Sequence, residues 1–100
     1  MESGFEGTLV KSITQGLTET LGEETARIIN FFLDPSVASK EPTRYTTLLE
    51  KMLSDEPVLE KLIEERIGEK LCSYASIPFE KGNGNRLWHY IQAAKENGKV

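Results

Sequence analysis

The sequence contains little of the chemistry that many enzymes and metalloproteins depend on. It has one cysteine, Cys72, and one histidine, His89, among its 100 residues. A lone cysteine excludes a disulfide within the chain and fits a reducing compartment. One cysteine and one histidine are also too few for the usual four-ligand structural zinc site. We therefore expect the protein to work without a bound metal or other cofactor.

Long apolar runs are missing as well. No stretch approaches the ~20 consecutive apolar residues that a helix needs to span a bilayer. The first residues, MESGFEGTLVK, include acids where a signal peptide carries bases, and no continuous apolar segment follows them. We expect a cytoplasmic protein that does not bind membranes.

A third absence is an excess of positive charge. The formal net charge is −4, whereas non-specific nucleic-acid binding relies on many lysines and arginines that neutralise phosphates. Acids concentrate in residues 50–70, and bases outnumber acids in residues 80–100. These two regions could attract each other within one fold, or each could face a partner.

What the sequence does contain is helical spacing of apolar residues along nearly its whole length. The first stripe repeats every four residues and consists of Phe5, Leu9, Ile13, Leu17 and Leu21. The pattern predicts an all-α fold, a compact single-domain bundle of about five helices over residues 1–100, with residues 1–4 disordered. Gly16 lies inside the stripe and costs ~1 kcal/mol relative to alanine, so we expect a close helix crossing there.

The second predicted helix, Glu23 to Leu33, is apolar over more than half of its circumference. Its apolar residues are Ala26, Ile28, Ile29, Phe31, Phe32 and Leu33. A helix of this kind is typically surrounded by other helices, so we expect it at the centre of the bundle. The following segment, SVASKEP, is predicted to be a polar loop, with Pro42 in the first turn of the third helix.

The fourth predicted helix follows the start signal SDEP and ends near residue 74. Either Ser54 or Asp55 is expected to be its N-cap. Its apolar face rotates by about a third of a turn near Gly68, at 100° per residue. We interpret this rotation as two halves that pack on different neighbours. Gly68, Cys72 and Ala75 are expected to form a close-contact face.

The segment KGNGNRLWHY, which leads into the last predicted helix, has the glycines of a phosphate-binding loop. It matches neither GxxxxGK[ST] nor GxGxxG, since the last glycine of the second pattern falls on Leu87. We therefore expect Asn83-Gly84 to form a turn and Asn85 to cap the helix. Binding of an anion at the N-terminus of this helix is the alternative.

His89 and Cys72 are the candidates for acid–base or nucleophilic chemistry. A histidine titrates near neutrality, but no Ser, Asp or Glu stands at helical spacing to orient His89. Cys72 lies beside apolar residues, where a cysteine usually serves as a small apolar filler rather than as a thiolate. We expect no catalytic residues and no enzyme activity.

Two helix faces carry groups that a partner could recognise. The first is an acidic ladder at i, i+4 spacing, formed by Glu56, Glu60 and Glu64. It is either a solvated face or a docking face for cations, which could come from Lys81 and Arg86 or from a partner. The second face consists of Arg86, His89, Gln92 and Lys95. These residue types can contact base edges and phosphates, but four of them also make an ordinary solvated face.

The succession LGEETARIINFFL, LLEKML, VLEKLIEERIGEKL and LWHYIQAAK resembles small all-helical archaeal domains of unknown function. Some of those domains are attached to signal-transduction proteins as presumed output modules. The resemblance spans residues 9–95 and implies an intracellular interaction or regulatory module without known catalytic residues. We expect the chain to bind a protein partner or a second copy of itself. The alternative is a DNA-binding transcriptional regulator that uses the last helix, with nucleic acid as the less favoured partner.

Overall fold

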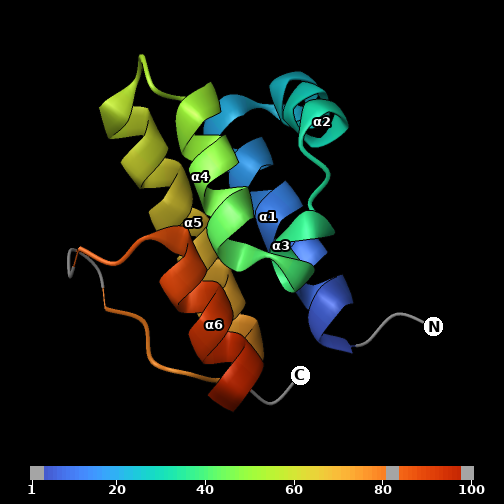
Figure 1. Ribbon diagram of the computed structural model, residues 1–100, viewed down its shortest axis with the longest axis vertical. Helices are drawn as coiled ribbons and strands as arrows, with labels where there is room; N and C mark the ends of the chain where they lie inside the picture. Colours follow the sequence, from blue (N-terminus) through green and yellow to red (C-terminus); the bar gives the residue numbers. More distant parts are fainter. Residues whose placement is uncertain (1–3, 81–83, 98–100) are drawn as a thin grey trace.

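The computed structural model describes residues 4–80 and 84–97, and every regular element within them is an α-helix (Figure 1). In chain order the helices are α1 (Gly4–Leu21), α2 (Glu23–Phe32), α3 (Val37–Lys40), α4 (Pro42–Met52), α5 (Pro57–Ala75) and α6 (Leu87–Asn97). The predicted all-α single-domain bundle is therefore confirmed, with one short helix more than the sequence pattern indicated. No described helix is both long enough and apolar enough to cross a membrane. Residue 4, which we expected to be disordered, opens α1.

The two longest helices, α1 and α5, form the centre of the bundle (Figure 1). Their mutual contact is the most extensive between any two described helices. Each contributes fully buried side chains to the core, namely Leu9, Ile13 and Leu17 from α1 and Ile63, Ile67 and Leu71 from α5. Burial of one such side chain contributes about 1.5–3 kcal/mol. α6 packs on a different part of α5 and also contacts α4.

Gly16 lies where α1 crosses α5, as its place in the apolar stripe predicted. A Cβ atom added at Gly16 would lie 2.6 Å from Cγ1 of Ile67 and 3.2 Å from the backbone nitrogen of the same residue. A backbone contact of this kind cannot be relieved by turning a side chain. The absence of a side chain at Gly16 therefore sets the distance between the two central helices.

Gly68 has the same role on the neighbouring face of α5. A Cβ atom at Gly68 would lie 2.5 Å from a ring carbon of Tyr90, a residue of α6. Cys72 and Ala75, the other two small residues of the predicted close-contact face, are also buried. α5 runs as one helix through Gly68 and packs against α1 and α6. The rotation of its apolar face thus corresponds to two different neighbours.

The prediction that the second helix lies at the centre is wrong. α2 packs extensively against α1 alone among the described helices, and it lies toward the upper end of the molecule in Figure 1. The exposed fractions on its outer face are 51% for Ile28, 82% for Phe31 and 72% for Phe32. The physical reason is that this ten-residue helix follows α1 after the single residue Gly22. It therefore has one neighbour for an apolar surface that would suit several.

The start of α4 agrees with the sequence prediction, whereas the cap of α5 differs from it. The predicted polar loop contains the short helix α3, and Pro42 is the first residue of α4, as expected. α5 begins at Pro57, so its N-cap is Glu56. The sequence pattern predicted Ser54 or Asp55 as the cap, which is wrong. Because a proline disfavours helical backbone in the residue before it, the cap position falls immediately before Pro57.

Replacing Gly68 by alanine should destabilise the fold, because the added methyl group would overlap the ring of Tyr90. Overpacking of this kind typically costs about 1–3 kcal/mol, which exceeds the ~1 kcal/mol that alanine contributes in a helix. We expect urea denaturation to show a loss of about 1–2 kcal/mol in the free energy of unfolding. Ser73→Ala, at an exposed position of the same helix, is the control and should change it by less than about 0.5 kcal/mol. A Gly68→Ala variant as stable as the natural chain would show that α5 and α6 are not in close contact.

Candidate functional site

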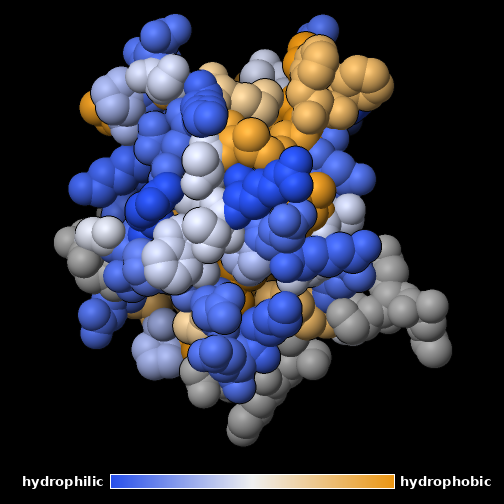
Figure 2. All heavy atoms as spheres, in the orientation of Figure 1, coloured by the Kyte–Doolittle hydropathy of each residue, from blue (hydrophilic) through white to orange (hydrophobic). Residues whose placement is uncertain are grey.

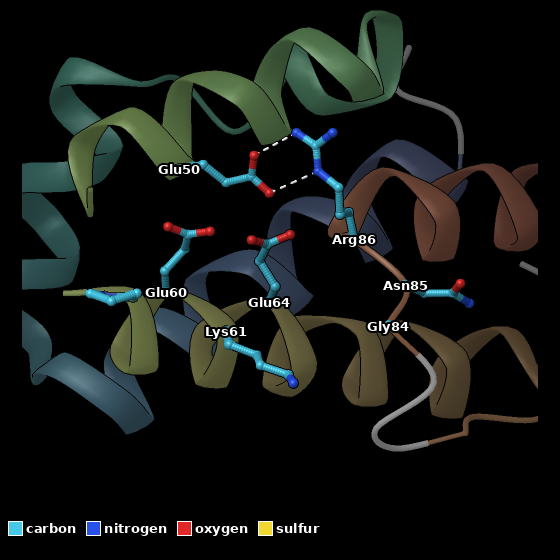
Figure 3. A pocket seen from close by; sticks show the side chains of 8 residues that line it. Glu50, Glu60, Lys61, Glu64, Gly84, Asn85 and Arg86 are labelled. Atoms are coloured by element: carbon cyan, nitrogen blue, oxygen red, sulfur yellow. Dashed lines mark hydrogen bonds and ion pairs between the residues drawn. The ribbon is translucent and has the colours of Figure 1, made fainter. Parts of the chain in front are cut away.

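Three charged residues predicted from the sequence, Glu60, Glu64 and Arg86, meet a fourth, Glu50, in one pocket (Figure 3). Glu50 comes from α4, the other two glutamates come from α5, and Arg86 immediately precedes α6. The pocket has a volume of ≈450 Å³, and its other lining residues are Pro57, Lys61, Gly84 and Asn85. We call Glu50, Glu60, Glu64 and Arg86 the acidic pocket. Glu50 was not predicted, because its helix showed no charge pattern of its own.

Arg86 and Glu50 form a two-point ion pair across the mouth of the acidic pocket (Figure 3). Nε of Arg86 donates to Oε2 of Glu50 at 3.0 Å, and a terminal nitrogen donates to Oε1 at 2.5 Å. The hydrogen bond to Glu50 raises the pKa of the guanidinium above its ordinary value. A paired guanidinium of this geometry joins α4 to the start of α6.

Glu64 is the buried member of the acidic pocket, with 5% of its surface exposed. Its Oε1 accepts a hydrogen bond of 2.7 Å from the backbone N–H of Leu87, the first residue of α6. Burial raises the pKa of Glu64 to about 8, although the Leu87 hydrogen bond acts in the opposite direction. The carboxyl group is therefore mostly neutral at pH 7.

The predicted acidic ladder is not one solvated face. Glu56 is exposed, Glu60 is half-buried, and Glu64 is buried. Burial also raises the pKa of Glu60, and the negative charge of Glu50 adds to this effect. The ladder turns from solvent toward the interior because α6 and the end of α4 cover its later members. The expectation of a solvated face therefore holds for Glu56 and is wrong for Glu64.

The three carboxylates of the acidic pocket have oxygen atoms within 4.8 Å of one another. Carboxylates at such distances repel one another unless a proton or a cation lies between them. Here the guanidinium of Arg86 supplies the positive charge on the side of Glu50. Arg86 therefore takes the place of an added cation, and the three glutamates are not assigned as metal ligands.

The second predicted face, on α6, is partly engaged within the chain. Arg86 pairs with Glu50, and Nζ of Lys95 donates to the carbonyl oxygen of Ser39 at 3.2 Å. Gln92 is exposed. Three of the four predicted residues, Arg86, His89 and Lys95, therefore already have partners inside the molecule.

His89 caps α6. Its Nδ1 accepts a hydrogen bond of 2.9 Å from the backbone N–H of Arg86, and its ring stacks on Trp88 with centroids 3.7 Å apart. This is the place that glutamate or glutamine takes in a capping box. Because α6 begins at Leu87, the N-cap position falls on Arg86. The prediction that Asn85 is the cap is therefore wrong by one residue.

The second candidate for chemistry, Cys72, is buried. Burial raises the pKa of its thiol above the ordinary value. The neutral thiol is thus favoured over the thiolate, which is the reactive form. This agrees with the interpretation of Cys72 as a small apolar residue of the core.

The sequence pattern missed a second feature, an apolar surface on α2 and α4. Figure 2 shows apolar side chains gathered at the upper right, over the region where Figure 1 places α2. Its exposed members are Ile28, Phe31 and Phe32 of α2 and Met52 of α4. A groove of ≈420 Å³ beside them is lined by Phe32, Leu33, Leu48, Lys51 and Met52. We call these residues together the α2–α4 apolar surface.

The sequence signal for this surface was present but was interpreted differently. An apolar circumference indicates either a helix with many neighbours or a helix that leaves part of its apolar surface exposed. Composition does not distinguish the two, because the number of neighbours depends on where the turn after α1 directs α2. The structure decides between them through the exposure of Phe31 and Phe32.

Comparison of the chain with protein-family models, with curated proteins and with solved structures finds no match. The resemblance to small archaeal helical domains therefore stays a prediction. The acidic pocket and the α2–α4 apolar surface are the two candidate functional features of the described residues.

The ion pair between Arg86 and Glu50 should contribute to stability, because its loss leaves a mostly buried carboxylate next to two others. We expect Arg86→Gln to lower the free energy of unfolding at pH 7 by about 1–3 kcal/mol. Arg44→Gln is the matched control, since Arg44 pairs with Glu41 on an exposed helix surface. Exposed pairs of that kind contribute up to about 1 kcal/mol, and often less. Urea denaturation of both variants measures the difference, and equal losses would contradict a special role for the pair in the pocket.

Proposed function

We propose that the protein is a helical interaction module that binds a second copy of itself through the α2–α4 apolar surface. The observation that carries the proposal is the exposure of two adjacent phenylalanines, 82% for Phe31 and 72% for Phe32, beside an apolar groove. Their rings contact each other edge to face with centroids 5.2 Å apart. Large apolar side chains gathered in this way on a small domain mark binding surfaces.

The area of this surface suits a dimer. A phenylalanine side chain has ~200 Å², so the two rings with Ile28 and Met52 expose on the order of 500 Å² of apolar surface. A standard interface buries about 800 Å² on each partner, and homodimer interfaces are about 65% apolar. The surface therefore supplies about the apolar area that one side of a standard homodimer interface requires.

The shape of the surface favours a second copy over another occupant. A two-fold dimer brings the same patch of both subunits together, so each patch must carry both a projection and a recess for it. The rings of Phe31 and Phe32 provide the projection, and the groove between α2 and α4 provides the recess. Lys51 lines this groove and forms no ion pair with any described residue. One charged group beside an apolar recess is typical of the rim of an interface.

The proposal places binding away from the residues predicted from the sequence. Glu64 is buried, and Arg86 and Lys95 are engaged within the chain. A role by binding rather than by catalysis agrees with a capping role for His89 and with the burial of Cys72. The lone cysteine also supports a cytoplasmic location, and an interaction module agrees with the resemblance to output domains of signal-transduction proteins.

Phe32→Asp should weaken self-association, because it places a charge in the apolar recess of the interface. We expect sedimentation velocity to show a concentration-dependent dimer for the natural chain in the micromolar range. The Phe32→Asp variant should remain a monomer at concentrations at least about 10-fold higher. Val58→Asp is the matched control, since Val58 is 83% exposed but belongs to the start of α5.

The outcomes separate the possible occupants. A natural chain that stays monomeric up to millimolar concentration would overturn self-association and leave a different protein as the occupant. A dimer that survives Phe32→Asp but is lost in Val58→Asp would place the interface at α5 instead. Circular dichroism of each variant checks that the helices are retained.

A further inference from the structure

We propose that the two copies of the dimer cross, so that α2 of each copy lies over α4 of the other and Glu24 of one copy pairs with Lys51 of the partner subunit. This arrangement rests on the proposed self-association and adds to it an orientation and a charged contact. Hydrophilic side chains border the α2–α4 apolar surface in Figure 2. Most charged groups of α2 and α4 are engaged within the chain, whereas Glu24 and Lys51 are not.

Glu24 lies on the same outward stripe of α2 as two exposed apolar residues. Glu24, Ile28 and Phe31 are at i, i+4 and i+7 spacing, which places them on one side of a helix with 100° per residue. All three are exposed. The distance from Glu24 to Phe31 along the helix axis is about 10 Å, whereas an interface of about 800 Å² on each partner is about 30 Å across. A partner that receives the ring of Phe31 therefore meets the carboxylate of Glu24 in the same contact.

The other charged groups of this part of the chain are engaged. Arg27 pairs with Glu23 at 2.9 Å, and the carboxylate of Asp34 accepts a hydrogen bond of 2.9 Å from the backbone N–H of Ser36. Glu24 has no such partner among the described residues. Its carboxylate is therefore available to a cation from outside the chain.

Lys51 is the corresponding cation on α4. It is exposed, lines the groove of the α2–α4 apolar surface, and forms no ion pair with any residue that the structure describes. The neighbouring charges of α4 are already paired, Glu50 with Arg86 and Arg44 with Glu41. Within the described part of the chain, an unpaired acid thus borders the projection of the surface and an unpaired base borders its recess.

These positions favour a crossed dimer over one in which like helices meet. If α2 packed on α2 of the other copy, projection would meet projection and both grooves would stay empty. Glu24 would then face either apolar side chains or the Glu24 of the partner subunit, and both contacts are unfavourable. In the crossed dimer, two-fold symmetry gives the interface two copies of the pair between Glu24 and Lys51. Opposite charges at the rim of an interface determine its orientation more than its affinity.

Charge reversal followed by sedimentation velocity tests the pair. Glu24→Lys and Lys51→Glu each create two like-charged contacts in the crossed dimer, so each variant alone should have a dimer dissociation constant at least about 10-fold higher than that of the natural chain. An equimolar mixture of the two variants should dimerise again, because each reversed position of one copy faces the opposite charge on the other. Glu56→Lys, which makes the same change of charge at an exposed position outside the surface, is the matched control and should change the dissociation constant by less than about 2-fold. Circular dichroism checks that each variant keeps its helices.

A second measurement uses the natural chain and does not depend on the folding of variants. A carbodiimide joins a lysine amine to a carboxylate that lies in contact with it. Mixing isotope-labelled and unlabelled chains before the reaction lets mass spectrometry separate links between copies from links within one copy. We expect a link between Lys51 of one copy and Glu24 of the other. Lys70 and Glu19, an ion pair within the chain, provide the positive control.

The outcomes distinguish the crossed arrangement from self-association itself. A dimer that Phe32→Asp disrupts but that both charge reversals leave unchanged would overturn the pair and retain the interface. A mixture of the two reversed variants that stays monomeric while both are folded would also overturn the pair. The same holds if the control link forms and no link joins Lys51 to Glu24 between copies. A natural chain that stays monomeric would overturn self-association, and the crossed dimer with it.

Discussion

The close approach of two helices to α5 is the constraint on which the rest of the structure depends. Gly16 lets α1 lie against the backbone of Ile67, and Gly68 lets the ring of Tyr90 lie against α5 from the side of α6. A helix packed on two sides has few directions left for its polar residues. Glu64 lies in the turn before these contacts and is therefore buried between α5, α4 and the start of α6.

Burial of Glu64 in turn explains the arrangement of charges around it. An ionised carboxylate without partners is costly in a protein interior, whereas a neutral, hydrogen-bonded carboxyl group costs much less. The protein satisfies Oε1 of Glu64 with a backbone N–H, and the nearby carboxylate of Glu50 is paired with Arg86. A glutamine in place of Glu64 could accept the same hydrogen bond from Leu87 without titrating.

The parts of the fold that the sequence predicted are those that follow from local spacing. A glycine inside an apolar stripe indicated the crossing at Gly16, and the rotation of the apolar face indicated two neighbours on either side of Gly68. The parts that it did not predict depend on how the helices are placed relative to one another. The position of α2 depends on the turn at Gly22, and the burial of Glu64 depends on a helix more than twenty positions later in the chain. No spacing rule within one helix contains that information.

At the candidate site, too, spacing predicted which residues share a helix face but not which residues of other helices they contact. Spacing placed Glu60 and Glu64 on one face and suggested that cations such as Arg86 could face them, and all three do line the acidic pocket. It could not reveal that Glu50 is the residue that Arg86 binds, because this pair joins two helices that are far apart in the sequence. Charge composition identifies the groups that attract one another, but the tertiary fold decides which of them meet.

α4 contributes residues to both candidate functional features, the acidic pocket and the α2–α4 apolar surface. Glu50 lies on the side of α4 that faces the acidic pocket, while Leu48 and Met52 line the groove of the α2–α4 apolar surface. Residues two apart in a helix point in directions about 200° from each other, so the two sides of one short helix carry the two features. α4 has its extensive contacts with α3 and α6 among the described helices. Its position therefore depends on the start of α6, where Arg86 pairs with Glu50 of α4.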